Sequence, residues 1–322
     1  MRSWSGELAG ELARERPDAV LLHYSVFSYS HRGLPLFVGP VLSALRRSGA
    51  PLITVLHEFA YPWLRSGVRG TAWAVSQRAL LIEVMRASAA ALVTIDTRAD
   101  WLASRVWLPW RPVAFAPVFS NLPLPSAAQS SYRDRGRQRI GVFGYSHEGS
   151  AIALVLDSVR LLQERALNVE LMLLGAPGRC SSTGEAWLKG AAMRAIALAP
   201  SFSGTLAVQE LSDAIAACDI LLFADSAGPS SRKTTLAASL ASGRAVVAID
   251  GPLRWSELTD ARAVHLVAPT PEALADGLDM LVRDERLRRA LAERGRAFVE
   301  RQMGVARSAG AVAGLLDRVL AI

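Results

Sequence analysis

A strand and the turn that follows it stand near the middle of the chain, Arg139-Ile-Gly-Val-Phe143 and then Gly144-Tyr-Ser-His-Glu-Gly-Ser150. Comparable apolar runs recur at 19–23, 52–57, 91–95, 113–117, 169–174, 219–223 and 245–249. Such near-continuous runs are typical of strands buried on both faces of a parallel sheet. Helical patterns lie between them, near 5–16, 36–47, 71–88, 97–105, 151–165, 183–198, 208–217 and 231–242, and then from about 272 to the end. This alternation predicts an α/β protein with doubly wound parallel sheets.

The chain divides at residues 118–138, a segment of prolines, small polar residues and charges without hydrophobic periodicity. Such composition is typical of a linker. We therefore expect two Rossmann-like domains facing a cleft, residues 1–137 (with the linker 118–137) and residues 138–303. The last helix, 304–322, is expected to pack back on the first domain.

Positive charge is concentrated in the first domain. The chain has 36 Lys and Arg against 29 Asp and Glu, a net charge of +7, and residues 1–137 hold 16 Arg and 9 acids. This asymmetry favours an anionic partner for the first domain, although arginine-rich codon usage would produce the same excess. Arginines and tryptophans interspersed over residues 65–111 also predict peripheral contact with an anionic membrane surface. The alternative is a solvated helix face with the tryptophans in the core.

Several classes of protein are disfavoured. No apolar run approaches the roughly 18–20 residues that span a membrane, and the first residues lack the apolar core of a secretory signal. Cys180 and Cys218 form neither a disulfide framework nor a metal signature, and the five histidines show no metal-site spacing. The basic residues form no compact stripe, which argues against a nucleic-acid partner. We expect a cytoplasmic protein, with the inner face of the membrane as its site of peripheral contact.

Loops at the carboxyl ends of strands are where open α/β sheets bind ligands. In the first domain His57 and Glu58 follow a strand, where a histidine can accept a hydroxyl proton near neutral pH and a glutamate can orient it. The loop 24–35 offers further aromatic, hydroxyl and charged groups. The alternatives are a histidine that caps a strand and an ordinary turn. The acceptor contacts predicted from these two loops are Tyr29, His31, Arg32 and Tyr61.

Two loops of the second domain suit an anion. The glycine-bounded turn after Phe143 leads into a helix, which aims free backbone N–H groups and a positive helix end at a ligand. Ser230-Ser-Arg232-Lys233-Thr-Thr235 stands at another helix start, and Lys233 is one of only two lysines in the chain. Arg binds phosphate oxygens in a bidentate manner and Lys supplies a point charge. The alternatives are an ordinary strand-to-helix turn and a run of N-capping serines with solvated cations.

Together these features resemble the GT-B glycosyltransferases, specifically the retaining, nucleotide-sugar-dependent type usually called family 4. The resemblance covers the chain from about residue 17. Its most specific stretch is 202–251, with Phe202-Ser-Gly-Thr-Leu206, Leu211-Ser-Asp-Ala-Ile-Ala-Ala-Cys-Asp-Ile-Leu-Leu222 and Leu240-Ala-Ser-Gly-Arg-Ala-Val-Val-Ala248. Thr94-Ile-Asp-Thr-Arg98 and Pro117-Val-Phe-Ser-Asn121 also look like family landmarks.

The resemblance implies a role for each loop. The donor diphosphate would lie by Gly144, the nucleotide base by Gly204 and the two residues after it, and the reacting sugar near His57. The helix start at 230–235 would hold the diphosphate or the sugar, and from their own chemistry we expect Arg232 and Lys233 to neutralise the leaving diphosphate without a metal ion or another cofactor. The donor-binding residues expected on this basis are Gly144, Tyr145, Ser146, Gly204, Thr205, Leu206, Ser230, Ser231, Thr234 and Thr235. The residues expected to serve catalysis are His57, Glu58, Arg232 and Lys233.

The chain also differs from the family pattern. Tyr145 and a residue near Ser150 stand where the family places Arg and Lys, and Ser230 and Ala238 stand at the positions of its two glutamates. The glycine-rich opening unit of the family is missing, so we expect either a short first domain or a misassigned start site. The sequence predicts a hexosyltransferase-type enzyme of bacterial cell-envelope polysaccharide, glycolipid or natural-product glycosylation. The alternative is a non-catalytic protein of the same fold that binds a sugar nucleotide or supports a partner transferase.

Overall fold

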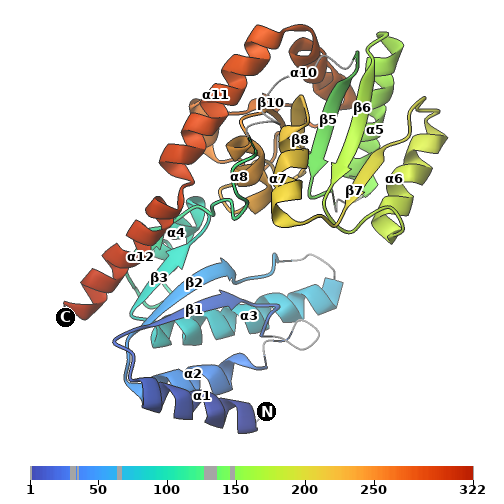
Figure 1. The fold of residues 1–322 in the computed structure, drawn as a ribbon. Coiled ribbons are helices and arrows are strands. Elements are labelled where there is room, and N and C mark those ends of the chain that lie inside the picture. The colour runs from blue at the N-terminus through green and yellow to red at the C-terminus, as the bar shows by residue number, and fades with distance from the viewer. Residues whose placement is uncertain are drawn as a thin grey trace. The chain divides into compact units, whose positions relative to one another are not determined.

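The computed structural model describes residues 2–29, 34, 36–63, 67–126, 136–145 and 149–321 (Figure 1). They form two compact units: unit 1 comprises Met1–Pro117 and Val305–Ile322, and unit 2 comprises Val118–Gly304. Each unit contains one sheet whose paired strands all run parallel. The predicted α/β fold with two Rossmann-like sheets is therefore confirmed.

Unit 1 has a four-stranded sheet with helices on both faces. Its strands, in the spatial order β1-β2-β3-β4, are β1 (Val20–Ser25), β2 (Leu52–Glu58), β3 (Ala90–Val93) and β4 (Val113–Phe115). Its helices are α1 (Arg2–Glu15), α2 (Val38–Ser48), α3 (Gly67–Ala87), α4 (Thr97–Ala103) and α12 (Val305–Leu320). Side chains of β2 alternate between the faces. Leu52 and Leu56 pack with α2 and α3, whereas Ile53 and Val55 pack with Leu315 of α12.

Unit 2 has a six-stranded sheet in the order β10-β9-β8-β5-β6-β7. The strands are β5 (Gln138–Phe143), β6 (Val169–Leu174), β7 (Ser201–Gly204), β8 (Ile220–Phe223), β9 (Ala245–Ile249) and β10 (His265–Val267). The helices are α5 (Gly149–Glu164), α6 (Ser182–Met193), α7 (Val208–Ala216), α8 (Thr234–Ala241), α9 (Ser256–Asp260), α10 (Pro271–Arg283) and α11 (Glu285–Gln302). The chain moves outward from β5 to β7 and then returns to β8. The topological switch point therefore lies between β5 and β8.

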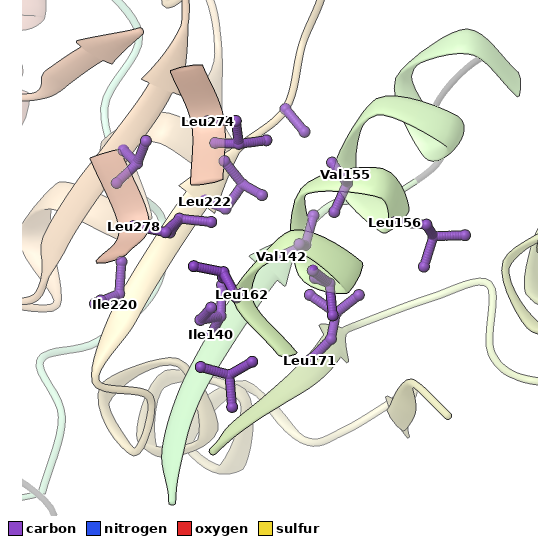
Figure 2. Close-up of a cluster of buried hydrophobic side chains, with 14 of the residues drawn as sticks. Ile140, Val142, Val155, Leu156, Leu162, Leu171, Ile220, Leu222, Leu274 and Leu278 are labelled. Atoms are coloured by element: carbon purple, nitrogen blue, oxygen red, sulfur yellow. The ribbon is translucent and has the colours of Figure 1, made fainter. Parts of the chain in front are cut away.

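The core of unit 2 joins α5 and α10 to the sheet. Figure 2 shows Val155 and Leu156 of α5 and Leu274 and Leu278 of α10 gathered over side chains of β5, β6 and β8. All four helix residues are buried, and burial of each such side chain is worth about 1.5–3 kcal/mol. This packing fixes the sheet whose carboxyl edge carries the loops after β5 and β8.

The first part of the linker packs on unit 2, whereas the prediction attached all of 118–137 to the first domain. Backbone N–H of Val118 donates to the Ser231 carbonyl at 2.8 Å. The backbone N–H and hydroxyl of Ser126 each donate to an Asp213 carboxylate oxygen at 2.7 Å. The prediction for 118–126 was wrong because hydrogen bonds to α7, invisible in the linker's own composition, tie this segment to unit 2.

The described helices include none that is long and apolar enough to cross a membrane. The longest is α3 with 21 residues, and it carries three arginines, Arg69, Arg78 and Arg86. These charges suit a helix at the surface of unit 1. Val68, near the first residue of α3, is 90% exposed.

Candidate functional site

The loops after β5 and β8 meet at the switch point of unit 2. Gly144 directly follows β5 and has a φ of +74°, a left-handed conformation that favours glycine. A Cβ added to Gly144 would lie 2.7 Å from Cγ2 of Thr235, in the first turn of α8. The structure thus brings together two elements that the sequence proposed separately as anion-binding loops.

The start of α8 offers backbone donors to this place. The helix begins at Thr234, so the residues from Ser230 to Lys233 precede it and do not form its first turn as the pattern predicted. Lys233 is the N-cap residue, and its side chain makes no capping hydrogen bond. Because the first N–H groups of a helix have no partner within it, they can bind an anion there. Thr234 is exposed and Thr235 half-buried.

The polar groups around α8 differ in their accessibility. Ser230 and Ser231 are both 1% exposed, so their hydroxyls do not lie at the surface as the predicted donor contacts would. Ser230 Oγ has no hydrogen-bond partner in the described part of the chain, while the Ser231 carbonyl accepts from Val118. Arg232 and Lys233 are half-buried. Lys233 Nζ forms an ion pair with Asp225, which follows β8, so part of its charge is already neutralised.

Tyr145 has a structural side chain rather than one facing a donor. Its ring is fully buried. Its hydroxyl donates to the Gly175 carbonyl at 3.2 Å and accepts from Gly178 N–H at 2.6 Å, while Trp187 Nε1 donates to its carbonyl at 3.1 Å. The predicted donor contact is therefore corrected for this side chain, which holds the loop after β6 in place. Ser146 lies outside the described residues.

The end of β7 lies at the same edge of the unit 2 sheet. Gly204 closes β7 with φ of +67°, and among the described residues other than its chain neighbours no atom lies within 4 Å of where its Cβ would be. An isolated bridge joins it to Gly175 at the end of β6. Thr205 is exposed and Leu206 half-buried. These three residues stay the predicted contacts for a nucleotide base.

In unit 1, His57 lies at the carboxyl end of β2. Its Nε2 is 3.0 Å from Nδ1 of His23 on β1, and Arg98 of α4 donates a hydrogen bond to its carbonyl. Burial lowers the pKa of His57 below its ordinary value, the charges of His23 and Arg98 lower it further, and Glu58 opposes them. His57 is thus neutral at pH 7, the state in which an imidazole can accept a proton. Glu58 is half-buried beside it.

The other predicted acceptor residues lie in different surroundings or outside the described residues. Tyr61 lies edge-on to Trp73 of α3, with ring centroids 5.2 Å apart. Trp73 also lies under the Arg69 guanidinium, 4.7 Å from it, and both line a hollow of about 510 Å³ together with Ala72 and Leu34. Tyr29 is half-buried, and its hydroxyl donates to the His23 carbonyl at 3.1 Å. His31 and Arg32 lie outside the described residues.

The sequence reasoning missed His23, and it counted Trp73 among the residues for membrane contact but not among the acceptor residues. Both neighbouring strands carry a histidine near their carboxyl ends, in Leu-Leu-His23 and Val-Leu-His57, and this repetition was the available signal. For Trp73 the signal was Arg69 four residues earlier, because residues at that spacing share one face of a helix. Among the described residues, no group of three or more His, Cys, Asp and Glu side chains is placed to hold a metal ion.

Two Rossmann-type units, with converging loops at the switch point of the second, are the architecture of the GT-B class. Residues 137–284 match the family model described as Glycosyl transferases group 1. No curated protein matches the chain significantly. The family match lies within unit 2 and contains every predicted donor-binding residue and both Arg232 and Lys233.

Solved structures resemble the chain over nearly its whole length. A glycosyltransferase from Rickettsia africae ESF-5 has a TM-score of 0.75 at 12% identity, covering 98% of this chain and 80% of its own. An α,α-trehalose 6-phosphate synthase from Burkholderia multivorans has a TM-score of 0.67 at 15% identity, covering 98% and 74%. WaaG, a glycosyltransferase involved in lipopolysaccharide biosynthesis, has a TM-score of 0.63 at 15% identity, covering 98% and 95%. The resemblance to GT-B glycosyltransferases is thus confirmed for the fold, and for residues 137–284 by sequence.

Proposed function

We propose that this protein transfers a sugar from a nucleoside diphosphate donor to an acceptor, with retention of configuration and without a metal ion. The approach of Gly144 to Thr235 carries the proposal, because it places a glycine turn and the uncapped start of α8 together at the switch point of unit 2. Parallel α/β sheets bind ligands at that point. The match of residues 137–284 to a glycosyltransferase model supports the same conclusion.

Transfer requires that negative charge on the departing diphosphate be stabilised as the bond between sugar and phosphate oxygen breaks. The α8 N–H groups, Arg232 and Lys233 supply that stabilisation. Lys233 is paired with Asp225, so a bound diphosphate would compete with Asp225 for its ammonium group. The departing phosphate oxygen takes the proton of the acceptor hydroxyl, whose oxygen bonds to the sugar on the face that the phosphate leaves. His57, neutral and held by Arg98, orients the sugar or acceptor.

The first test is calorimetry with UDP, GDP and ADP, followed by a transfer assay with the sugar nucleotides of the diphosphate that binds. Arg232→Ala and Lys233→Ala should each reduce turnover by about 10²-fold, as removal of one preorganised charge-stabilising donor does. Lys189→Ala is the matched control, because Lys189 is the other lysine of the chain and lies exposed on α6. Near wild-type transfer by the Arg232→Ala, Lys233→Ala double variant contradicts the proposal.

The second candidate is a protein that binds a sugar nucleotide without transferring the sugar. The ion pair between Lys233 and Asp225 favours it, because a carboxylate beside the leaving group reduces the net positive charge there. The same two measurements separate the candidates. Micromolar binding of a nucleoside diphosphate with neither transfer nor donor hydrolysis would support the binding protein, and turnover would exclude it.

For the acceptor we propose an anionic molecule bound by unit 1, in cell-envelope polysaccharide, glycolipid or natural-product glycosylation in a bacterial cytoplasm. Arg69 over Trp73 and Arg78 over Trp63 present guanidinium groups on aromatic rings, and Trp63 is 52% exposed. Such groups also suit the inner face of a membrane, where each basic residue near the surface contributes about 1 kcal/mol. The protein should sediment with phosphatidylserine vesicles at low salt and not at high salt. Absence of pelleting at low salt contradicts the membrane contact.

A further inference from the structure

His23 and His57 are brought together by an irregularity in the pairing of β1 and β2. The register runs His23 to Val55 and Tyr24 to Leu56, and then shifts so that Ser25 pairs with Glu58. His57 is therefore left without an opposite residue on β1. It shares a face of the sheet with Val55, because side chains two residues apart point the same way. His23, opposite Val55, lies on that face too, and a bulge of this kind re-aims a side chain.

The two imidazole rings lie edge to edge in almost one plane. Their planes are inclined by 17° and their centroids are 5.3 Å apart. A five-membered ring built from bonds of about 1.33 Å has a radius of about 1.1 Å. Two such radii and the 3.0 Å between Nδ1 of His23 and Nε2 of His57 span the whole distance between the centroids. The two nitrogens therefore face each other along the line of their in-plane lone pairs, which is hydrogen-bond geometry and not face-to-face stacking.

Such a contact holds one proton between the two nitrogens. An N–H···N hydrogen bond needs a donor on one ring and a lone pair on the other, and two N–H groups facing each other at 3.0 Å would repel. Within the described part of the chain, charged and polar groups that act on the pair include Arg98 on α4, Glu58 on β2 and the Tyr29 hydroxyl on the His23 carbonyl. Arg98 and His23 oppose a second positive charge on His57 more than Glu58 favours it.

We propose that His23 is a positioning residue: through its Nδ1 it fixes the ring orientation and the tautomer of His57, so that the two imidazoles act as one unit holding a single proton between them. The inference rests on the proposed sugar transfer for its role in catalysis, since it is His57 that lies near the reacting sugar there. The second ring nitrogen of His57 is then Nδ1. In a neutral His57, Nδ1 carries the proton when His23 donates the hydrogen bond, and has a free lone pair when His57 donates it. His23 acts only through His57.

Two variants at one position test the proposal. His23→Asn keeps an amide group at the place of Nδ1 and can restore the hydrogen bond, whereas His23→Phe keeps a flat ring and removes the bonding nitrogen. Both remove the charge of His23, so both should raise the pKa of His57 by ¹⁵N NMR titration. Only His23→Phe should change the ¹⁵N shifts that report the His57 tautomer. The resonance of His265 in unit 2 is the internal control.

In the transfer assay, His23→Phe should lose roughly 10- to 100-fold in kcat with little change in the donor KM, by analogy with the loss when a partner that orients a metal-bound histidine is removed. His23→Asn should retain most of the wild-type kcat. Equal kcat in both variants and unchanged His57 ¹⁵N shifts in His23→Phe would overturn the inference. A wild-type protein that transfers no sugar contradicts the proposed function instead, and the NMR comparison still decides the tautomer.

Discussion

Gly144 offers the sharpest test of the unit 2 site. In Gly144→Ala the new side chain has to adopt φ of +74°, and a left-handed conformation costs about 1–2 kcal/mol for a residue with a Cβ. The Cβ would also lie 2.7 Å from Thr235 Cγ2, well inside the usual contact of about 3.5–4.0 Å between carbons. Either the end of β5 or the start of α8 must move. The free energy of unfolding should fall by at least about 1–2 kcal/mol.

The matched control is Gly149→Ala, at the other end of the same turn. Gly149 is the first residue of α5 and has no positive φ, and apart from its chain neighbours no described atom lies within 4 Å of an added Cβ. Its stability should therefore be near that of the wild type. By thermal unfolding, Gly144→Ala should lose roughly 2–8 °C, given about 2–4 °C per kcal/mol for a unit of this size. Because the start of α8 moves, its affinity for the nucleoside diphosphate should fall as well.

A second substitution separates strain from collision. Thr235→Ser removes Cγ2 but keeps the hydroxyl. Gly144→Ala combined with Thr235→Ser should therefore recover the part of the stability lost to the collision, while the free energy cost of a left-handed φ at residue 144 remains. If Gly144→Ala and Gly149→Ala unfold at the same temperature, or if the double variant is no more stable than Gly144→Ala, the predicted contact between the two loops is refuted.

Three further outcomes are expected. Tyr145→Phe leaves the Gly178 N–H without its acceptor and should lower the free energy of unfolding by about 1–3 kcal/mol in urea denaturation; an unchanged midpoint contradicts this role. Asp213→Ala removes the acceptor of both Ser126 hydrogen bonds, so limited proteolysis should cut residues 118–126 faster than in the wild type. Because the folded protein lowers the pKa of His57, the unfolded chain binds a proton first as the pH falls below about 6.5. Stability should therefore decrease from that pH downward, and by less in His57→Gln; an equal decrease in both contradicts the shift.

The fold could be predicted because local runs of apolar residues indicate most of its strands. All eight apolar runs that were interpreted as strands form strands, since a strand buried on both faces needs apolar residues throughout. β10 was missed because its three residues, His265–Val267, are too few to form a recognisable run. β7, at Ser201–Gly204, was marked only by the family resemblance. α8 begins at Thr234 because the preceding serines and basic residues form a loop.

The candidate site was less predictable because it depends on contacts between distant segments. The turn at Gly144 and the start of α8 were each identified, but their approach follows from the strand order that sets β5 beside β8. Tyr145 looked like a ligand contact because it follows a glycine turn, and its burial depends on the loop after β6. The ion pair of Lys233 with Asp225 likewise depends on how the loop 225–233 closes on itself.

The arginine content of unit 1 has a structural use that codon usage alone does not explain. Both lysines of the chain lie in unit 2. Four guanidinium groups of unit 1 lie 4.2–5.1 Å from the centres of aromatic rings: Arg69 over Trp73, Arg78 over Trp63, Arg98 over Phe59 and Arg105 over Trp101. A planar guanidinium can stack on a ring and still donate hydrogen bonds at its edge, which an ammonium group cannot.

Two of these arginines do both at once. Arg78 stacks on Trp63 and donates to the Tyr61 carbonyl at 2.9 Å, and Arg98 stacks on Phe59 and donates to the His57 carbonyl. Each therefore ties the loop after β2, which carries the candidate acceptor residues, to a helix that follows. Codon usage can set how many arginines a chain has, but it cannot place guanidinium planes over rings. Arg78 and Arg98 therefore contribute positive charge to unit 1 because they hold the loop after β2 in place. The same guanidinium groups make the surroundings of that loop electrostatically suited to an anionic acceptor.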